Sequence, residues 1–348
     1  MVLFRRFEPE GGRAFERARW EEVVMRLSTG HGVDIVYAIA VNCIWGLAFV
    51  IPKYLTDIDP TMVALGRYFV YGILSAGILL AAARAVSFAQ IPWIRAFAYA
   101  FIGHVGYYII LVWAISMGGV LVVAPIMATL PVSVAVVGNA LNKELGFRRL
   151  IFPLLFILVG ITFLRIYQNS ALSVDGAQAK NMIFGALLAF GALSMWTLYA
   201  VLNARYLKRS QISSVVWAQA MGFCCLLQVG IAISLWLVLH EQPALLFQSM
   251  GSHELMVKFL TGILVLGVVV SWFSTQVWNR VSRKLPITVA GQLLVVQSLA
   301  AIAYGSWLDR QVPHIVELIC VVLVVVGVVW GVKVAYESDA KSLSRLRK

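Results

Sequence analysis

Apolar stretches of about 20 residues recur along the chain, and short polar segments between them carry most of the charged side chains. A helix of this length crosses about 30 Å of hydrocarbon, so each stretch can span a membrane. The pattern predicts an all-α polytopic membrane protein with ten transmembrane helices. We place them near residues 35–54, 61–83, 94–115, 119–141, 149–168, 182–203, 214–239, 257–278, 287–308 and 314–334.

The composition agrees with a membrane protein, since 61% of the residues are hydrophobic and only 13% are charged. The net charge of +12 does not indicate a nucleic-acid partner, because Lys and Arg lie in short loops and at the termini. The partners that we expect are the lipid bilayer and a small-molecule substrate.

The loop charges predict the orientation of the chain. Of the Lys and Arg residues, 22 fall on the side of the termini and five on the opposite side. Such an imbalance places both termini in the cytoplasm of a multi-pass protein of the cell (inner or plasma) membrane.

Three polar segments flank or separate the apolar regions. Residues 1–34 contain six arginines and resemble no cleaved signal peptide, because no apolar region and cleavage site precede the first span. We expect a cytoplasmic segment there, either an interfacial helix or a disordered tail. Residues 169–181 form a predicted non-cytoplasmic loop, and residues 335–348 a basic cytoplasmic tail.

The chain reads as two related halves, 35–168 and 182–334. Trp196 and Gln219 follow Trp45 and Arg67 at a nearly constant offset. Because five spans per half is an odd number, the two copies must insert with opposite orientation. This predicts two inverted five-helix repeats, which in transporters enclose a site near the bilayer midplane.

Motifs in both halves resemble one known family. They are Ile44-Trp45-Gly46, Lys53, Pro60, Arg67, Leu130-Pro131-Val132, Gly138 and Glu144 in the first half, and Gly185, Trp196, Tyr199, Trp278-Asn279-Arg280 and Pro286-Ile287-Thr288 in the second. Their order and spacing over residues 35–334 resemble the drug/metabolite transporter (DMT) superfamily, specifically EamA-type transporters with two EamA repeats.

The resemblance implies a secondary transporter that exports amino acids, other metabolites or drugs by alternating access. It also implies a central cavity lined by helices one to four and six to nine, with helices five and ten at the periphery. The chain departs from the family pattern at Gln297, where the second repeat would have a proline.

Arg67 is a charged residue inside a predicted span, about two turns from its start. A charge in hydrocarbon is costly, so such a residue is functional or tied to a partner. Its guanidinium could bind a substrate carboxylate through two parallel N–H donors. The alternative is a structural arginine that reaches the outer interface.

Aromatic residues within spans are candidates for the cavity wall, although each could instead be a helix-packing residue. They are Trp45, Tyr108, Trp196, Tyr199 and Tyr304.

Amides within spans need hydrogen-bond partners, and interhelical bonds are the ordinary explanation. Asn42, Gln276 and Gln297 join the candidate cavity residues, Gln297 first because it lies mid-span in a predicted cavity helix. Pro131 is expected inside the fourth helix, where it would bend the helix and could act as a gating point.

The centres of the predicted spans carry no Asp or Glu, and His104 is the mid-span group that titrates near neutrality. A lone histidine is more often a packing residue, so we expect facilitated or weakly coupled export.

Two other classes remain open. A membrane scaffold or receptor would move no solute. An intramembrane enzyme is disfavoured, because His253-Glu254 lacks a second histidine at Val257 and no phosphate-binding loop occurs. We predict no catalytic residues, metal or cofactor. We expect a monomer, although Gly327-xxx-Gly331 could support a homodimer through the tenth helix.

Overall fold

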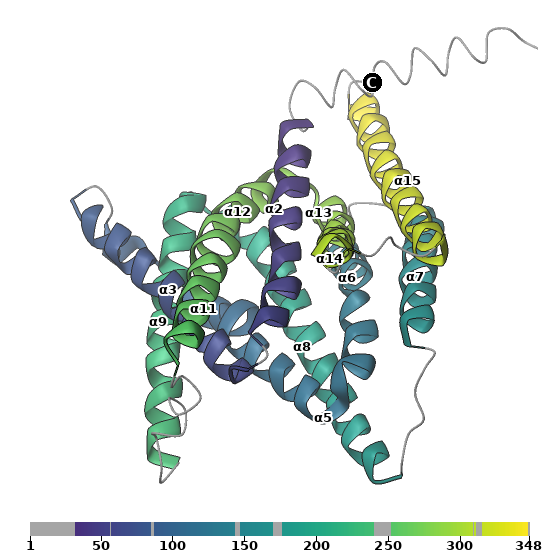
Figure 1. The fold of residues 1–348 in the computed structure, drawn as a ribbon. Coiled ribbons are helices and arrows are strands. Elements are labelled where there is room, and N and C mark those ends of the chain that lie inside the picture. The colour runs from purple at the N-terminus through teal and green to yellow at the C-terminus, as the bar shows by residue number, and fades with distance from the viewer. Residues whose placement is uncertain are drawn as a thin grey trace, which may run out of the picture.

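A computed structural model describes residues 32–55, 57–84, 87–142, 147–169, 176–239, 252–308, 310 and 315–346, and within these ranges every regular element is helical. The predicted N-terminal segment 1–34 lies almost entirely outside them. The first half contains α2 (Gly32–Val50), η2 (Ile51–Tyr54), α3 (Pro60–Ala81), η3 (Phe88–Gln90), α4 (Trp93–Ala100), η4 (Phe101–Val105), α5 (Gly106–Ala128), α6 (Leu130–Asn142) and α7 (Phe147–Asn169) (Figure 1).

The second half contains the remaining helices. These are α8 (Gly176–Arg209), α9 (Ser214–Leu239), α11 (His253–Leu264), η5 (Val265–Phe273), α12 (Ser274–Lys284), α13 (Ile287–Leu293), α14 (Val295–Leu308) and α15 (Ile315–Leu346).

Six helical stretches are long and apolar enough to cross a membrane, namely Pro60–Ala81, Trp93–Gly118, Asn181–Arg209, Ser214–Val238, His253–Lys284 and Ile287–Leu308. Three shorter apolar helices, Gly32–Ala48, Leu130–Asn142 and Leu318–Val334, accompany them in the described ranges. The structure therefore confirms an all-helical protein with several spans, and the predicted count of ten stays a prediction.

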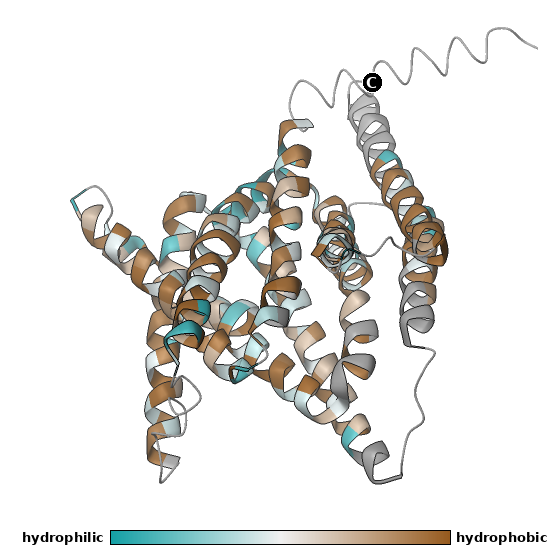
Figure 2. Ribbon diagram, viewed as in Figure 1, coloured by the Kyte–Doolittle hydropathy of each residue, from teal (hydrophilic) through white to brown (hydrophobic). Residues whose placement is uncertain are grey.

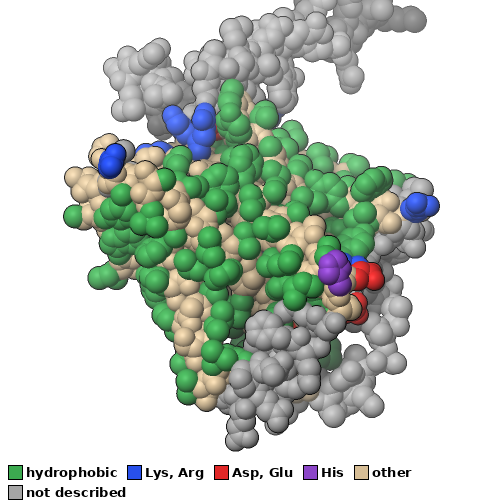
Figure 3. Space-filling view, turned by 60° about the vertical axis from the view of Figure 1, so that its left-hand side comes forward, with side chains coloured by type: hydrophobic (Ala, Val, Ile, Leu, Met, Phe, Trp, Pro, Cys, Tyr) green, Lys and Arg blue, Asp and Glu red, His purple; other side chains and the backbone are tan. Residues whose placement is uncertain are grey.

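Hydrophobic side chains cover the outside of these helices. In the ribbon of Figure 2, hydrophobic residues (brown) make up much of the coloured part of the helices, and hydrophilic positions lie mainly near helix ends and along α12. The face in Figure 3 is largely hydrophobic, with charged side chains toward its edges. Leu80 and Val238 are 72% and 82% exposed, which suits contact with lipid tails rather than water.

Each long helix of the first half packs against a helix of the second half. The pairs are α2 with α14, α3 with α9, α5 with α8, α6 with α13, and α7 with α15. The α7–α15 pair lies at one side of the molecule, at the right in Figure 1. The core of the molecule thus lies between the two halves.

Glycines allow the paired helices to approach closely. The glycines at these contacts are Gly46, Gly72, Gly222, Gly118, Gly185, Gly138, Gly291, Gly160 and Gly327. A Cβ on Gly138, for example, would lie 2.5 Å from Cγ2 of Ile287. Lipid tails are as apolar as the side chains, so the hydrophobic effect does not drive helices together in a membrane. They associate instead through close van der Waals packing of this kind.

The boundary between the predicted third and fourth spans differs in the structure. Helix α5 continues through residues 116–118, where the sequence pattern predicts a turn, and the helix is interrupted at Thr129 instead. Thr129 donates from its backbone N–H and its hydroxyl to the carbonyl of Ile126, at 3.1 and 2.7 Å. Pro131 therefore sits in the first turn of α6, where its missing N–H costs nothing, rather than inside a bent helix.

Several helices extend beyond the apolar stretches that predict them. Helix α8 runs to Arg209 and α15 to Leu346, well past the predicted ends at 203 and 334. Hydropathy marks the membrane-buried part of a helix, but backbone hydrogen bonding continues into polar sequence.

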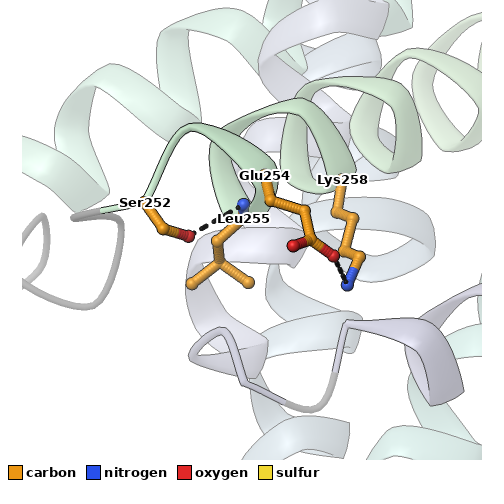
Figure 4. Close-up of polar contacts among 4 residues, drawn as sticks. All are labelled: Ser252, Glu254, Leu255 and Lys258. Carbon is orange, nitrogen blue, oxygen red and sulfur yellow. Dashed lines mark hydrogen bonds and ion pairs between the residues drawn. The ribbon is translucent and has the colours of Figure 1, made fainter.

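Polar side chains start two of the spanning helices. The Asp59 carboxylate accepts from the N–H groups of Thr61 and Met62, and Pro60 follows as the first helical residue. Ser252 accepts from the N–H of Leu255, and Glu254 pairs with Lys258 at 2.7 Å (Figure 4). The carboxylate of the incomplete His-Glu motif is thus paired with a lysine.

Two π-helical segments interrupt the regular helices. Segment η4 lies between α4 and α5 in the first half, and η5 lies between α11 and α12 in the second. Their i→i+5 bonds shift the register of the side chains that follow, and such segments often occur at functional sites.

The Gly118–Gly185 contact offers a test of the α5–α8 pair. A Cβ on Gly185 would overlap the backbone of Gly118, whereas a Cβ on Gly191 of the same helix would meet no atom within 4 Å. We expect Gly185→Ala to destabilise the purified protein by about 1–3 kcal/mol. Thermal unfolding followed by circular dichroism in detergent measures the difference.

Gly191→Ala is the matched control, and it should leave stability unchanged or raise it slightly because alanine favours helix. Equal unfolding temperatures for the two variants would show that α5 and α8 are not in backbone contact.

Candidate functional site

Three tryptophans from three helices meet in the core between the halves. The ring of Trp45 on α2 lies 6.0 Å from that of Trp196 on α8 and 5.1 Å from that of Trp278 on α12, centroid to centroid. Trp196 and Trp278 are 6.2 Å apart. The structure therefore brings together Trp45 and Trp196, which occupy equivalent positions in the two predicted repeats.

A second group of rings continues from this tryptophan cluster. The Tyr199 ring lies 5.9 Å from Trp196 and 5.2 Å from His104 in η4. His104 in turn lies 5.9 Å from Tyr68 and 5.8 Å from Tyr71, both on α3. The rings form a continuous aromatic network from α2 and α12 through α8 and η4 to α3.

Arg67 lies at the α3 end of this aromatic network. Its guanidinium carbon is 5.2 Å from the centre of the Tyr68 ring and 5.7 Å from that of Tyr108, within the range of cation–π attraction. Its Nε donates to the hydroxyl of Ser271 at 2.7 Å. No acidic side chain in the described ranges forms an ion pair with Arg67.

Three consecutive residues of η5 hold groups from three helices. The carbonyl of Val270 accepts from Nε1 of Trp45 at 3.1 Å, and Ser271 accepts from Arg67. Trp272 donates from Nε1 to Oε1 of Gln219 on α9 at 3.0 Å. The π-helical segment thus binds α2 and α3 of the first half and α9 of the second.

The predicted amide residues lie on several helices. Asn42 is fully buried on α2 and donates to the carbonyl of Ala38 within the same helix. Gln276 is half-buried on α12 and donates to the carbonyl of Trp272 at 3.5 Å. Both amides therefore bond locally, and neither touches the guanidinium of Arg67 through a hydrogen bond.

Two predicted residues lie on α14, beside α2. Gln297 is half-buried, and a Cβ on Gly46 would lie 3.1 Å from its backbone carbonyl. Tyr304 is also partly exposed, two turns further along α14. Neither has a ring contact or side-chain hydrogen bond with the aromatic network.

The structure groups five of the nine predicted cavity residues around one network, namely Trp45, Arg67, Tyr108, Trp196 and Tyr199. Sequence reasoning missed Tyr68, Tyr71 and Trp278 as members, and it favoured a packing role for His104. Tyr68 directly follows Arg67, and that adjacency was the available signal. The partners on η5 had none, because a π-helix leaves no periodic pattern.

A second polar cluster, also missed, joins α8, α9 and α12. Nδ2 of Asn203 donates to Oδ1 of Asn279 at 2.9 Å, and Nε1 of Trp217 donates to Oδ1 of Asn203 at 2.7 Å. On the neighbouring face of α12, Arg280 pairs with Asp34 of α2 at 3.2 Å. These bonds tie α12 to both halves directly beside the aromatic network, since Asn279 follows Trp278.

No group of three His, Cys, Asp or Glu side chains is placed to hold a metal ion in the described ranges.

Gly327 and Gly331 of α15 face partners in the same chain. A Cβ on Gly327 would approach the carbonyl of Pro153 on α7, and one on Gly331 would meet the side chain of Gln292. The oligomeric state stays a prediction.

Comparisons with known proteins show what this chain is similar to. Residues 33–166 match the EamA-like transporter family. Inner membrane protein YtfF of Escherichia coli (strain K12) is 28% identical over 309 residues, which cover 86% of this chain and 94% of YtfF. A solved crystal structure of an unspecified protein aligns with a TM-score of 0.70 at 14% identity, over 88% of this chain and 98% of that one, and shows the fold alone.

The bond from Trp45 to η5 can be tested by a ring-preserving substitution. Trp45→Phe keeps an aromatic ring beside Trp196 and Trp278 but removes the donor to the Val270 carbonyl. We expect a loss of about 1 kcal/mol in unfolding free energy, the usual net worth of such a bond. Thermal unfolding by circular dichroism measures it.

Trp196→Phe provides the comparison, since no described hydrogen bond involves its ring nitrogen. A loss for Trp196→Phe as large as that for Trp45→Phe would mean that ring volume, not the bond to η5, sets the effect.

Proposed function

We infer from the EamA domain over residues 33–166 and the homology to YtfF that this chain is a multi-pass membrane transporter, and we propose that it carries small organic solutes with a carboxylate group. Amino acids and related metabolites have this chemistry, as do some drugs. The observation that carries the proposal is Arg67, a charge within a membrane span that faces two tyrosine rings and has no described acidic partner.

The aromatic network supplies the other half of the recognition. Trp45, Trp196 and Tyr199 form the apolar part of the network, which reaches the guanidinium through His104 and Tyr68. A solute with an apolar or aromatic body and an anionic end fits such a wall, because the body leaves water while the anion meets Arg67.

We further propose that the two halves are inverted five-helix repeats that rock about this site. The cross-half pairing supports it, because a two-fold axis would map α3 onto α9, α6 onto α13 and α7 onto α15. The π segments η4 and η5, one in each half, also correspond under such an axis. The interruptions at Thr129 and Leu294 provide a third matched pair, and Pro131 beside the first is the proposed gating point.

The proposed direction is export across the inner or plasma membrane, with both termini in the cytoplasm. The excess of Lys and Arg in loops on the side of the termini supports this orientation. The name of YtfF as an inner membrane protein supports the location.

Flux measurements test the function directly. The purified chain in proteoliposomes should move members of an amino-acid and metabolite panel, and Arg67→Ala should raise the KM for a carboxylate solute by about 10- to 100-fold, the loss expected for a charge-assisted hydrogen bond. Gln297→Ala should also reduce flux if Gln297 lines the path.

Lys258→Ala is the control, because Lys258 lies on the exposed surface of α11 and, among the described residues, forms its ion pair with Glu254. Parental transport by both Arg67→Ala and Gln297→Ala would remove the proposed site, and the absence of solute flux from parental vesicles would favour a scaffold or receptor.

The pH dependence of transport tests whether His104 takes part in coupling. Its ring is buried among Tyr68, Tyr71 and Tyr199, and protonation would add a second positive charge near Arg67. We therefore expect His104→Asn to keep the pH profile of flux measured between pH 5 and pH 8. A profile that flattens in the variant would identify His104 as a proton-coupling group.

A further inference from the structure

The guanidinium of Arg67 is held at one of its three nitrogens. Nε donates to Oγ of Ser271 at 2.7 Å, and Oγ donates its own proton to the carbonyl of Leu266 at 2.9 Å. The hydroxyl can therefore only accept from Arg67. Ser271 is 2% exposed, so its two bonds are shielded from water and fix its orientation.

The bond to Leu266 depends on the π-helical geometry of η5. It joins residues five apart, and Ser274 makes the same kind of bond to the carbonyl of Val269 at 2.9 Å. A π segment widens the turn and leaves carbonyls that side chains can reach. Ser271 and Ser274 thus share one local arrangement, but only Ser271 contacts Arg67.

The remaining donors of Arg67 are its two terminal amino groups, Nη1 and Nη2. No described residue forms a hydrogen bond with them, while the Tyr68 and Tyr108 rings lie near the guanidinium. A guanidinium bound at Nε keeps one edge of two parallel N–H groups, the edge that matches the two oxygens of a carboxylate.

Charge balance limits the ligand. Arg67 supplies one positive charge without a described carboxylate to neutralise it, so a single solute carboxylate completes the site and a second one would leave an excess negative charge in the membrane.

We propose that Ser271 is a positioning residue, which orients the Arg67 guanidinium so that its terminal edge binds the carboxylate of a solute with a single carboxylate group. This inference rests on the proposed function and adds the residue that sets its selectivity for a carboxylate over a neutral amide. Ser271 acts through Arg67 and does not itself touch the solute.

Binding to the purified full-length chain in detergent provides the test, with phenylacetate and its neutral analogue phenylacetamide as probes. The parent should bind phenylacetate at least tenfold more tightly than phenylacetamide. Ser271→Ala should weaken phenylacetate binding by about tenfold, because the guanidinium loses its fixed direction, and leave phenylacetamide binding unchanged. Isothermal titration calorimetry measures both dissociation constants.

Ser274→Ala is the matched control, since it removes the same five-residue bond in the same segment without contact to Arg67. It should retain the selectivity of the parent. Ser271→Thr keeps a hydroxyl and should restore most of the selectivity.

Combining variants separates positioning from general structure. The lysine side chain has no N–H equivalent to the Nε–H of arginine. Ser271→Ala should therefore cause no further loss of phenylacetate binding in an Arg67→Lys background. This comparison holds even if Ser271→Ala lowers stability, because both arms carry the same change.

Three results would overturn the inference: equal effects of Ser271→Ala and Ser274→Ala, equal weakening of both probes by Ser271→Ala, or a parent that binds both probes alike. Carboxylate-selective binding without flux in proteoliposomes would leave the role of Ser271 intact and refute the proposed transport instead.

Discussion

The bonds made by the π-helical segment η5 are the constraint on which the centre of the molecule depends. Polar groups inside a membrane must be satisfied within the protein, because hydrocarbon offers no partners. Val270, Ser271 and Trp272 satisfy Trp45, Arg67 and Gln219, which belong to three helices and to both halves. Displacing this segment would leave three buried acceptors unpaired at once, so a movement of one half against the other has to break or exchange these bonds.

The same constraint explains why the aromatic network and the charge lie side by side. A guanidinium inside a span has lost part of its hydration and needs other favourable contacts. The faces of aromatic rings provide such contacts without a negative charge. Tyr68 and Tyr108 stabilise Arg67 in this way, and His104, Tyr199 and Trp196 extend the apolar wall from there. The site therefore combines one charge with a continuous chain of ring contacts, in which neighbouring rings meet at steep angles, 60° between His104 and Tyr199 and 69° between Tyr199 and Trp196.

The sequence predicted the parts of this arrangement that depend on composition and spacing. Trp45 and Trp196, which hold equivalent positions in the two predicted repeats, are in ring contact in the structure, and the predicted span 214–239 coincides with α9. Hydropathy could not predict the interruption at Thr129, because local capping and the proline two residues later decide it. It also could not predict η5, since a shift from i→i+4 to i→i+5 bonding arises from contacts with other helices rather than from local residue pattern.

Arg67 and Gln219 show how two halves with similar arrangements can differ in charge. They occupy equivalent positions in the two predicted repeats and bond to neighbouring residues of the same segment, Ser271 and Trp272. Only Arg67 carries charge, and Gln219 uses its oxygen for Trp272 while its amide nitrogen lacks a described partner. A solute anion would therefore be drawn to the first half alone. The charge that distinguishes the two predicted repeats is itself held by a bond between the halves, from Arg67 to Ser271.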